Sequence, residues 1–147
     1  MRQIRTILAL CTLAALAGCG GGGDSTKANS TVTVNYSAGV GQTGTISFTG
    51  NTWQATKTAN TITATTPLEN GDRVTITTPN PSTVPATYTS AQVTVNVIID
   101  GTTYTPADGF TVTVTNAAGN FAGNFTGPLV SGGSTIEVTS GTFLIQY

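Results

Sequence analysis

Histidine is missing from this chain, and cysteine is nearly so, with 2 residues among 147. Without histidine there is no Ser-His-Asp triad and no histidine-ligated zinc, and no side chain that ordinarily titrates near neutral pH. Both cysteines, Cys11 and Cys19, stand near the start of the chain. We therefore expect no disulfide and no reactive or metal-binding thiol in the rest of the sequence.

Charged residues are also scarce, at 7% of the sequence. Lysine and arginine together number 5 and the acidic residues 6, and Arg2 and Arg5 lie at the extreme N-terminus. A chain this weakly charged and slightly acidic lacks the basic patch that nucleic-acid binding needs. For the same reason we expect no attraction to anionic lipid headgroups.

Residues 1–18 match the three-part plan of a secretory signal peptide: two arginines, an apolar run over about residues 7–15, and small residues at the exit. The run is too short to span a bilayer, which takes roughly 20 apolar residues. Leu16, Ala17, Gly18 and Cys19 have the order of a bacterial lipobox. We expect a lipid on the sulfur of Cys19 and cleavage before it; the alternative is an ordinary signal peptide with an incidental cysteine.

The sequence thus predicts three parts: a lipoprotein signal peptide over 1–18, a lipidated cysteine with a glycine-rich tether over 19–30, and one β-domain over 31–147. Two or three acyl chains on Cys19 would hold the protein firmly on a membrane. By resemblance to lipoprotein sorting, Gly20 in place of aspartate favours the bacterial outer membrane. The domain would face either the periplasm or the cell surface.

From residue 31 onward the apolar residues recur at every second position, usually with threonine between them. This alternation is typical of strands with one buried and one wet face. The expected segments are Val32 to Tyr36, Thr45 to Phe48, Trp53 to Thr56, Thr61 to Thr65, Arg73 to Thr77, Val93 to Ile99, Phe110 to Thr115, Asn120 to Phe125, Thr135 to Val138 and Gly141 to Tyr147.

Turn residues separate these segments. Asp100-Gly101 between two strand-like runs is a strong hairpin signal, because a type I′ turn needs positive φ at both central positions. Asn70-Gly71, Asp108-Gly109, Gly132-Gly133 and Ser140-Gly141 mark further boundaries, and the prolines from Pro79 to Pro85 indicate a loop or edge. We predict an all-β fold, a single antiparallel β-sandwich or flattened barrel of about eight to ten short strands, with the sandwich favoured.

Four stretches together resemble a family of small bacterial lipoproteins of unknown function. They are a Trp-containing hairpin from Ile46 to Trp53, the strand from Phe110 to Thr115, a GxFxG strand from Gly119 to Phe125, and a closing TxGxF-type strand from Ile136 to Phe143. The resemblance implies an all-β domain. It implies no catalytic residues.

Aromatic side chains are the candidate ligand-binding residues. Trp53, the single tryptophan, could stack on a sugar or an apolar ligand, and Tyr88 and Tyr104 could line the same pocket. The plainer interpretation is that Trp53 packs in the core or at its rim, facing the same way as Ala55.

The carboxylates suggest two weaker hypotheses. Glu69, Asp72, Asp100 and Asp108 lie in predicted turns, where loop oxygens could bind calcium, although acidic residues are common in turns for geometric reasons. Two carboxylates could also hydrolyse a glycoside, but no pair is marked out. Ser131 and Ser134 lack an activating base. We therefore expect no catalysis, no cofactor and no metal.

The sequence predicts a cell-envelope lipoprotein that acts as a non-catalytic binding or interaction module, with an apolar or carbohydrate ligand as candidate partner. The alternative is a structural or adhesive surface protein acting through neutral, threonine-rich β faces. A weak carboxylate hydrolase ranks third. The first predicts a hollow apolar pocket, and the second predicts a filled core with open strand edges.

Overall fold

The computed structural model describes residues 28–147, which form strands and no helix. The strands are β1 (Ser30–Ser37), β2 (Thr43–Gly50), β3 (Thr56–Lys57), β4 (Thr61–Thr65), β5 (Arg73–Pro79), β6 (Ala86–Thr89), β7 (Thr94–Ile99), β8 (Thr102–Pro106), β9 (Thr111–Asn116), β10 (Asn120–Ser131) and β11 (Ser134–Gln146). Within this range no helix has the length and apolar character to cross a membrane. The predicted all-β class is confirmed.

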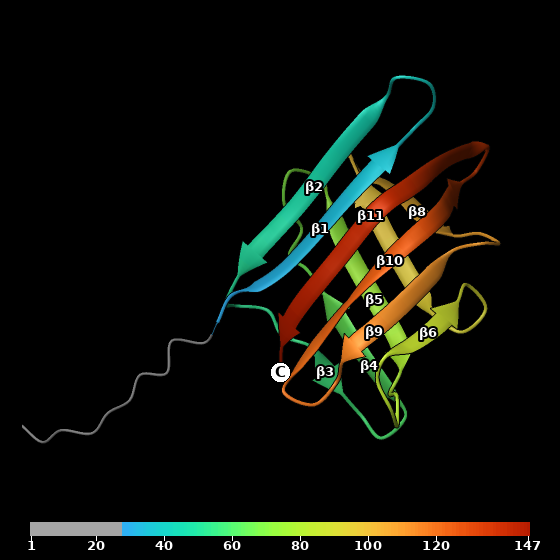
Figure 1. Cartoon of the computed structure of the whole chain (residues 1–147). Coiled ribbons are helices and arrows are strands. Elements are labelled where there is room, and N and C mark those ends of the chain that lie inside the picture. Colours follow the sequence, from blue (N-terminus) through green and yellow to red (C-terminus); the bar gives the residue numbers. More distant parts are fainter. Residues whose placement is uncertain (1–27) are drawn as a thin grey trace, which may run out of the picture.

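All strand pairs are antiparallel, and they join into one sheet of order β2-β1-β11-β10-β8-β7-β5-β4-β3, with β9 also pairing β10 and β6 pairing β9. The sheet curls on itself into a half-barrel, so that β4 and β5 lie behind β9 and β10 (Figure 1). The larger layer consists of β2, β1, β11, β10, β9 and β6, and the smaller layer consists of β8, β7, β5, β4 and β3. β10 joins the two layers by pairing β8 only at Leu129 and Val130. This architecture agrees with the predicted flattened barrel or sandwich.

The space between the layers is filled by the inward-facing residues of both. Phe110, just before β9, and Phe121 and Phe125 on β10 are almost completely buried. The rings of Phe121 and Phe143 have centroids 4.6 Å apart. The opposite layer contributes five side chains that are at most 1% exposed: Ile62, Val74, Ile76, Val95 and Val97. Period-two alternation therefore does place the apolar residues in one shared core.

Two predicted turns have the expected backbone. Asp100 and Gly101 have φ values of 50° and 78°, and the chain folds back from β7 into β8 there. Asn70 and Gly71 have φ values of 52° and 86°. Positive φ at two successive positions is what a type I′ hairpin turn requires.

Three local predictions need correction. Ser140-Gly141 is not a boundary, because β11 runs without a break through both residues. Of the predicted strand from Trp53 to Thr56, only Thr56 belongs to a strand. β10 continues past Phe125 to Ser131, with a register irregularity between Phe125 and Gly127 that lets the strand carry on.

The N-terminal edge of the domain is Ser30, one residue before the predicted boundary. Ser30 is fully buried, its hydroxyl donates a hydrogen bond to the carbonyl of Trp53 (3.2 Å), and it accepts one from the backbone N–H of Gln146 (3.0 Å). The first strand residue therefore links the loop after β2 to the last strand.

β6 was not predicted as a strand, because it follows a proline-rich segment and has only 4 residues.

Candidate functional site

The three candidate aromatic residues lie on different segments. Trp53 is in the loop between β2 and β3, Tyr88 is on β6 and Tyr104 is on β8, and each is half-buried against the core. The indole of Trp53 lies over Gly50, where an added Cβ would be 3.0 Å from Nε1. Tyr88 is paired with Val112 and Tyr104 with Val97 in the register of the sheet. Their neighbours are thus distinct, and each aromatic side chain extends the core.

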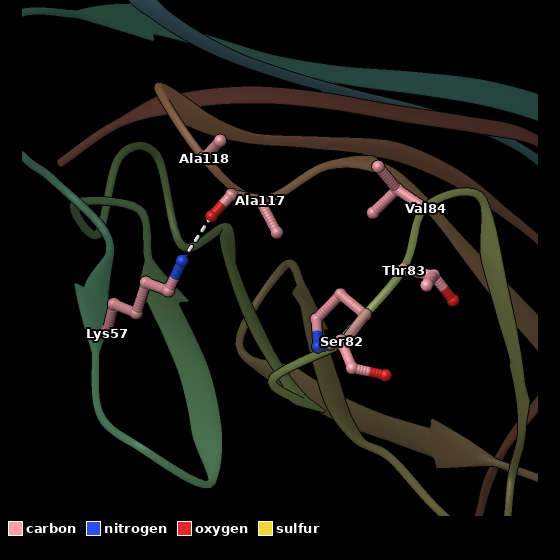
Figure 2. A pocket seen from close by; sticks show the side chains of 7 residues that line it. Lys57, Ser82, Thr83, Val84, Ala117 and Ala118 are labelled. Carbon is pink, nitrogen blue, oxygen red and sulfur yellow. Dashed lines mark hydrogen bonds between the residues drawn. The ribbon is translucent and has the colours of Figure 1, made fainter.

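A surface pocket of about 180 Å³ lies at the end of the molecule where β3, the segment before β6 and the turn between β9 and β10 meet. Figure 2 shows it from close by. Its lining consists of Lys57, Pro81, Ser82, Thr83, Val84, Ala117 and Ala118. None of the three aromatic candidates is among these residues.

Lys57 is held at this pocket by two contacts. Its ammonium donates a hydrogen bond to the backbone carbonyl of Ala117, drawn as the dashed line in Figure 2, and lies 5.5 Å from the ring centroid of Tyr147. The Tyr147 hydroxyl donates to the same carbonyl at 3.1 Å. Cation–π attraction and a shared acceptor thus fix the lysine head. The remaining ammonium protons and the hydroxyls of Ser82 and Thr83 could hold a small polar molecule.

Sequence reasoning did not single out Lys57. A lone lysine in a polar stretch carries no signal, and its partner is a backbone carbonyl 60 positions further along the chain. Only the fold brings them together. The pocket contains no carboxylate among its lining residues, so it offers no acid–base pair.

The acidic turns form a second cluster. Asp72 and Glu69 are joined by two backbone hydrogen bonds of 2.8 and 3.0 Å, and the Asp72 carboxylate accepts a hydrogen bond from the backbone N–H of Asp100 at 2.9 Å. Gly101 donates to the carbonyl of Gly71, which stacks one turn on the other. The carboxylate of Asp72 therefore acts as a brace between two hairpin turns.

These carboxylates do not gather as a metal site. Within residues 28–147 there is no group of three or more His, Cys, Asp or Glu side chains placed to hold a metal ion. Asp108 lies in a separate turn before Phe110. The same cluster still affects a neighbour: burial raises the pKa of the Tyr36 phenol, and the nearby Asp100 and Asp72 carboxylates raise it further.

The most extensive chemical feature is a line of polar side chains across the outer face of the larger layer. Directly opposed residues of antiparallel strands point to the same side. Following the register from β2 through β1, β11, β10 and β9 to β6 gives one unbroken line, here called the polar row: Ser47, Thr33, Thr142, Asn124, Thr113 and Thr87.

Hydrogen bonds and neutrality characterise the polar row. The hydroxyls of Thr33 and Ser47 lie 3.3 Å apart, and those of Thr87 and Thr113 lie 3.0 Å apart. Of all residues in the six strands that carry the row, only Glu137 is charged. A smaller line of the same kind crosses the other layer, through Thr56, Thr63, Thr77 and Thr94.

β2 forms one end of the sheet. It pairs with β1 over all eight of its residues, and in the part of the chain that the structure describes no strand pairs with its other side. Figure 1 shows it at the outer margin of the larger layer. The strand has no charge, no proline and no register irregularity. Charged residues, prolines and bulges are the usual devices that protect a sheet edge from pairing with another strand, and β2 has none of the three.

The predicted lipobox, Leu16 to Cys19, lies outside the described residues, as do the signal peptide and most of the tether. Comparison with known proteins adds no constraint, because no family model, no curated protein and no solved structure matches the chain.

Proposed function

We propose that this chain is a lipid-anchored, non-catalytic contact protein of the bacterial envelope, which acts through uncharged β faces rather than through an internal ligand. The observation that carries the proposal is the polar row: six strands present hydroxyl and amide groups side by side, with one charge among all their residues. Such a face forms short-range hydrogen bonds and exerts almost no long-range electrostatic steering.

The filled interior supports the same choice. The two functions weighed from the sequence differ in whether the domain is hollow or packed, and the space between the layers is occupied by apolar side chains from both. Trp53, Tyr88 and Tyr104 each pack against this core from a separate segment. In this proposal they stabilise the domain, and the contacts to other molecules come from the threonine-rich outer faces.

The anchor in this proposal is the lipid on Cys19, with the domain at the outer membrane, facing the periplasm or the exterior. The resemblance to small bacterial lipoproteins supports it, as does the lipobox. The direct test is Cys19→Ser in the full chain, followed by fractionation of the cells. We expect the wild type in the membrane fraction and the variant in the soluble fraction after secretion; a variant that still sediments with membranes contradicts the anchor.

The contact role is tested with a photo-activatable cross-linking residue placed at Thr142, in the middle of the polar row, in intact cells. The matched control carries the same residue at Thr103, an exposed position on β8 outside the row. We expect covalent adducts from Thr142 and far fewer from Thr103, and we expect Asn124→Lys beside Thr142 to suppress them. Equal yields at the two positions would contradict a contact role for the row.

One observation favours a second candidate function, the binding of a small carbohydrate. The pocket beside Lys57 combines an ammonium, the hydroxyls of Ser82 and Thr83 and the apolar side chain of Val84, which suits a sugar with polar edges and apolar faces. Titration calorimetry with neutral and acidic sugars, comparing wild type with Lys57→Met, tests this. Heats that persist unchanged in Lys57→Met would exclude the pocket.

A further inference from the structure

We infer that the free edge of β2 pairs with β2 of a second copy of this chain, so that the larger layers of two molecules form one continuous sheet. This inference rests on the contact role proposed above and names its first partner. The edge is 8 residues long and fully extended along β1. Its unpaired backbone N–H and C=O groups are a template for another strand.

Charge favours a second copy as the occupant. Residues 28–56, which include all of β1 and β2, contain no lysine, arginine, aspartate or glutamate. Pairing this edge with its own copy therefore brings no like charges together. It also satisfies two-fold symmetry, since an antiparallel pair of identical strands is an isologous contact.

The alternation of β2 restricts the register. Ile46 and Phe48 face the core, whereas Thr45, Ser47 and Thr49 face outward. Residues that oppose each other across the pair must face the same side of the sheet. The two-fold axis therefore lies midway between the two copies of one residue, which oppose each other, and residue i of one strand never opposes residue i+1 of the other. An axis at Ser47 places Ile46 opposite Phe48 of the second copy and Thr45 opposite Thr49. This register also joins the two polar rows end to end, because Ser47 is the terminal member of each.

Both copies can be anchored on the same membrane. Ser30 pairs with Gly50 at one end of β2, so in this register the two Ser30 residues lie about 20 Å apart along the strands, at about 3.4 Å per residue. The 11 residues from Gly20 to Ser30 can extend to at most about 40 Å. Confinement to one membrane raises the effective concentration of the partner.

Single cysteines in the otherwise native full chain, purified in detergent and oxidised, test the pairing and its register. Opposed residues in antiparallel strands have Cα atoms about 4.5 to 5.5 Å apart, within disulfide range. We expect Ser47→Cys to form a disulfide-linked dimer. A mixture of Thr45→Cys and Thr49→Cys should cross-link, whereas either alone should not. Thr33→Cys, one strand away from the edge, is the matched control, and wild type reports any bond through Cys11 or Cys19.

Charge variants give an independent test by analytical ultracentrifugation of the full chain. Ser47 is exposed, so Ser47→Lys should fold normally while placing two ammonium groups opposite each other and raising the dimer dissociation constant by at least about tenfold. Mixing Ser47→Lys with Ser47→Glu should restore a dimer. Thr142→Lys, on an interior strand of the same layer, should leave the dimer intact.

The outcomes separate the two proposals. A monomeric wild type, a dimeric Ser47→Lys, or cross-linking by Thr45→Cys alone overturns the β2 pairing. If the protein is a dimer but Thr142 gives no cross-links, the β2 pairing stands and only the contact role of the polar row is contradicted. If Thr142 gives cross-links but the protein is a monomer, the contact role stands and the β2 pairing is contradicted.

Discussion

The ring of Phe125 on β10 occupies the space directly above Gly141 on β11, its partner in the register. A Cβ built at Gly141 would lie 2.6 Å from Cζ of Phe125, closer than real side chains approach one another. The side chain of Phe125 is only 1% exposed, and the centroids of the Phe125 and Phe143 rings are 6.4 Å apart, so the Phe125 ring has little room to move. Gly141 is thus required by the core rather than by a turn.

Gly141→Ala should therefore lower the free energy of unfolding by about 1 to 3 kcal/mol, the usual cost of overpacking a filled core. Gly133→Ala is the matched control, because Gly133 has no neighbour within 4 Å of an added Cβ. Urea denaturation followed by tryptophan fluorescence measures both. Equal midpoints for the two variants would mean that the Phe125 ring yields to the methyl group.

Two buried threonines should respond in opposite ways to the same substitution. Thr78 is 1% exposed and its hydroxyl has no protein partner, whereas the Thr66 hydroxyl accepts a hydrogen bond from the Val74 N–H (2.9 Å) and donates one to the Pro67 carbonyl (3.1 Å). Removing a buried hydroxyl that has no partner relieves a desolvation cost, and removing one with two partners leaves buried groups unsatisfied.

We expect Thr78→Val to raise the free energy of unfolding by about 1 kcal/mol and Thr66→Val to lower it by about 1 to 3 kcal/mol. Each variant is the control for the other, because both substitutions replace a hydroxyl by a methyl group. Thermal and urea unfolding of both give the sign directly. A destabilised Thr78→Val would reveal a polar partner for that hydroxyl.

Stability should fall at alkaline pH. Burial raises the pKa of the phenols of Tyr88 and Tyr147 above 10.0, and burial together with Asp100 and Asp72 raises the pKa of Tyr36. In the unfolded chain these phenols ionise near pH 10. Because the folded state keeps its protons to higher pH, its stability is complete below about pH 10 and declines as pH rises toward the folded pKa values.

The measurement is a titration of tyrosinate absorbance, together with urea midpoints at about pH 8 and about pH 11. Tyr147→Phe removes one contributor and also the hydrogen bond to Ala117. It should be less stable than wild type at neutral pH and lose less of its stability on alkalinisation. A folded protein whose phenols all ionise at their ordinary pH would contradict the prediction.

The brace between the acidic turns gives a further prediction. Asp72→Ala removes the acceptor of the Asp100 N–H and should cost about 0.5 to 1.5 kcal/mol of unfolding free energy. Asp108→Ala, in an exposed turn, should change stability by less than about 0.5 kcal/mol. Urea unfolding at neutral pH measures both variants, and an equal loss of stability in Asp72→Ala and Asp108→Ala would contradict the brace.

The sequence predicted the parts of the fold that depend on near neighbours. Alternation identified Val95, Val97 and Ile99 as one buried face, and the Asp100-Gly101 pair identified the hairpin, because both signals are local. The break proposed at Gly141 was wrong, since the need for glycine there comes from Phe125 on the adjacent strand. No local pattern distinguishes a glycine under a ring from a glycine in a turn.

The candidate site was less accessible from sequence. Threonine at alternate positions indicated wet β faces, but the continuity of the polar row depends on five strand registers that bring distant residues such as Ser47 and Thr87 into one line. The pocket beside Lys57 depends on a backbone carbonyl, which every residue possesses. Such arrangements exist only in the assembled sheet.

β1 lies between β2 and β11, and this placement governs when the domain can form. Thr31 pairs with Leu144, a residue 113 positions later, so the larger layer stays incomplete until the last strand has been synthesised. Closing so long a loop is slow, because its entropy is lost before the contacts compensate. We expect a chain truncated before β11 to leave the first hairpin detached and prone to aggregation, and full-length protein to acquire its fold in one late step.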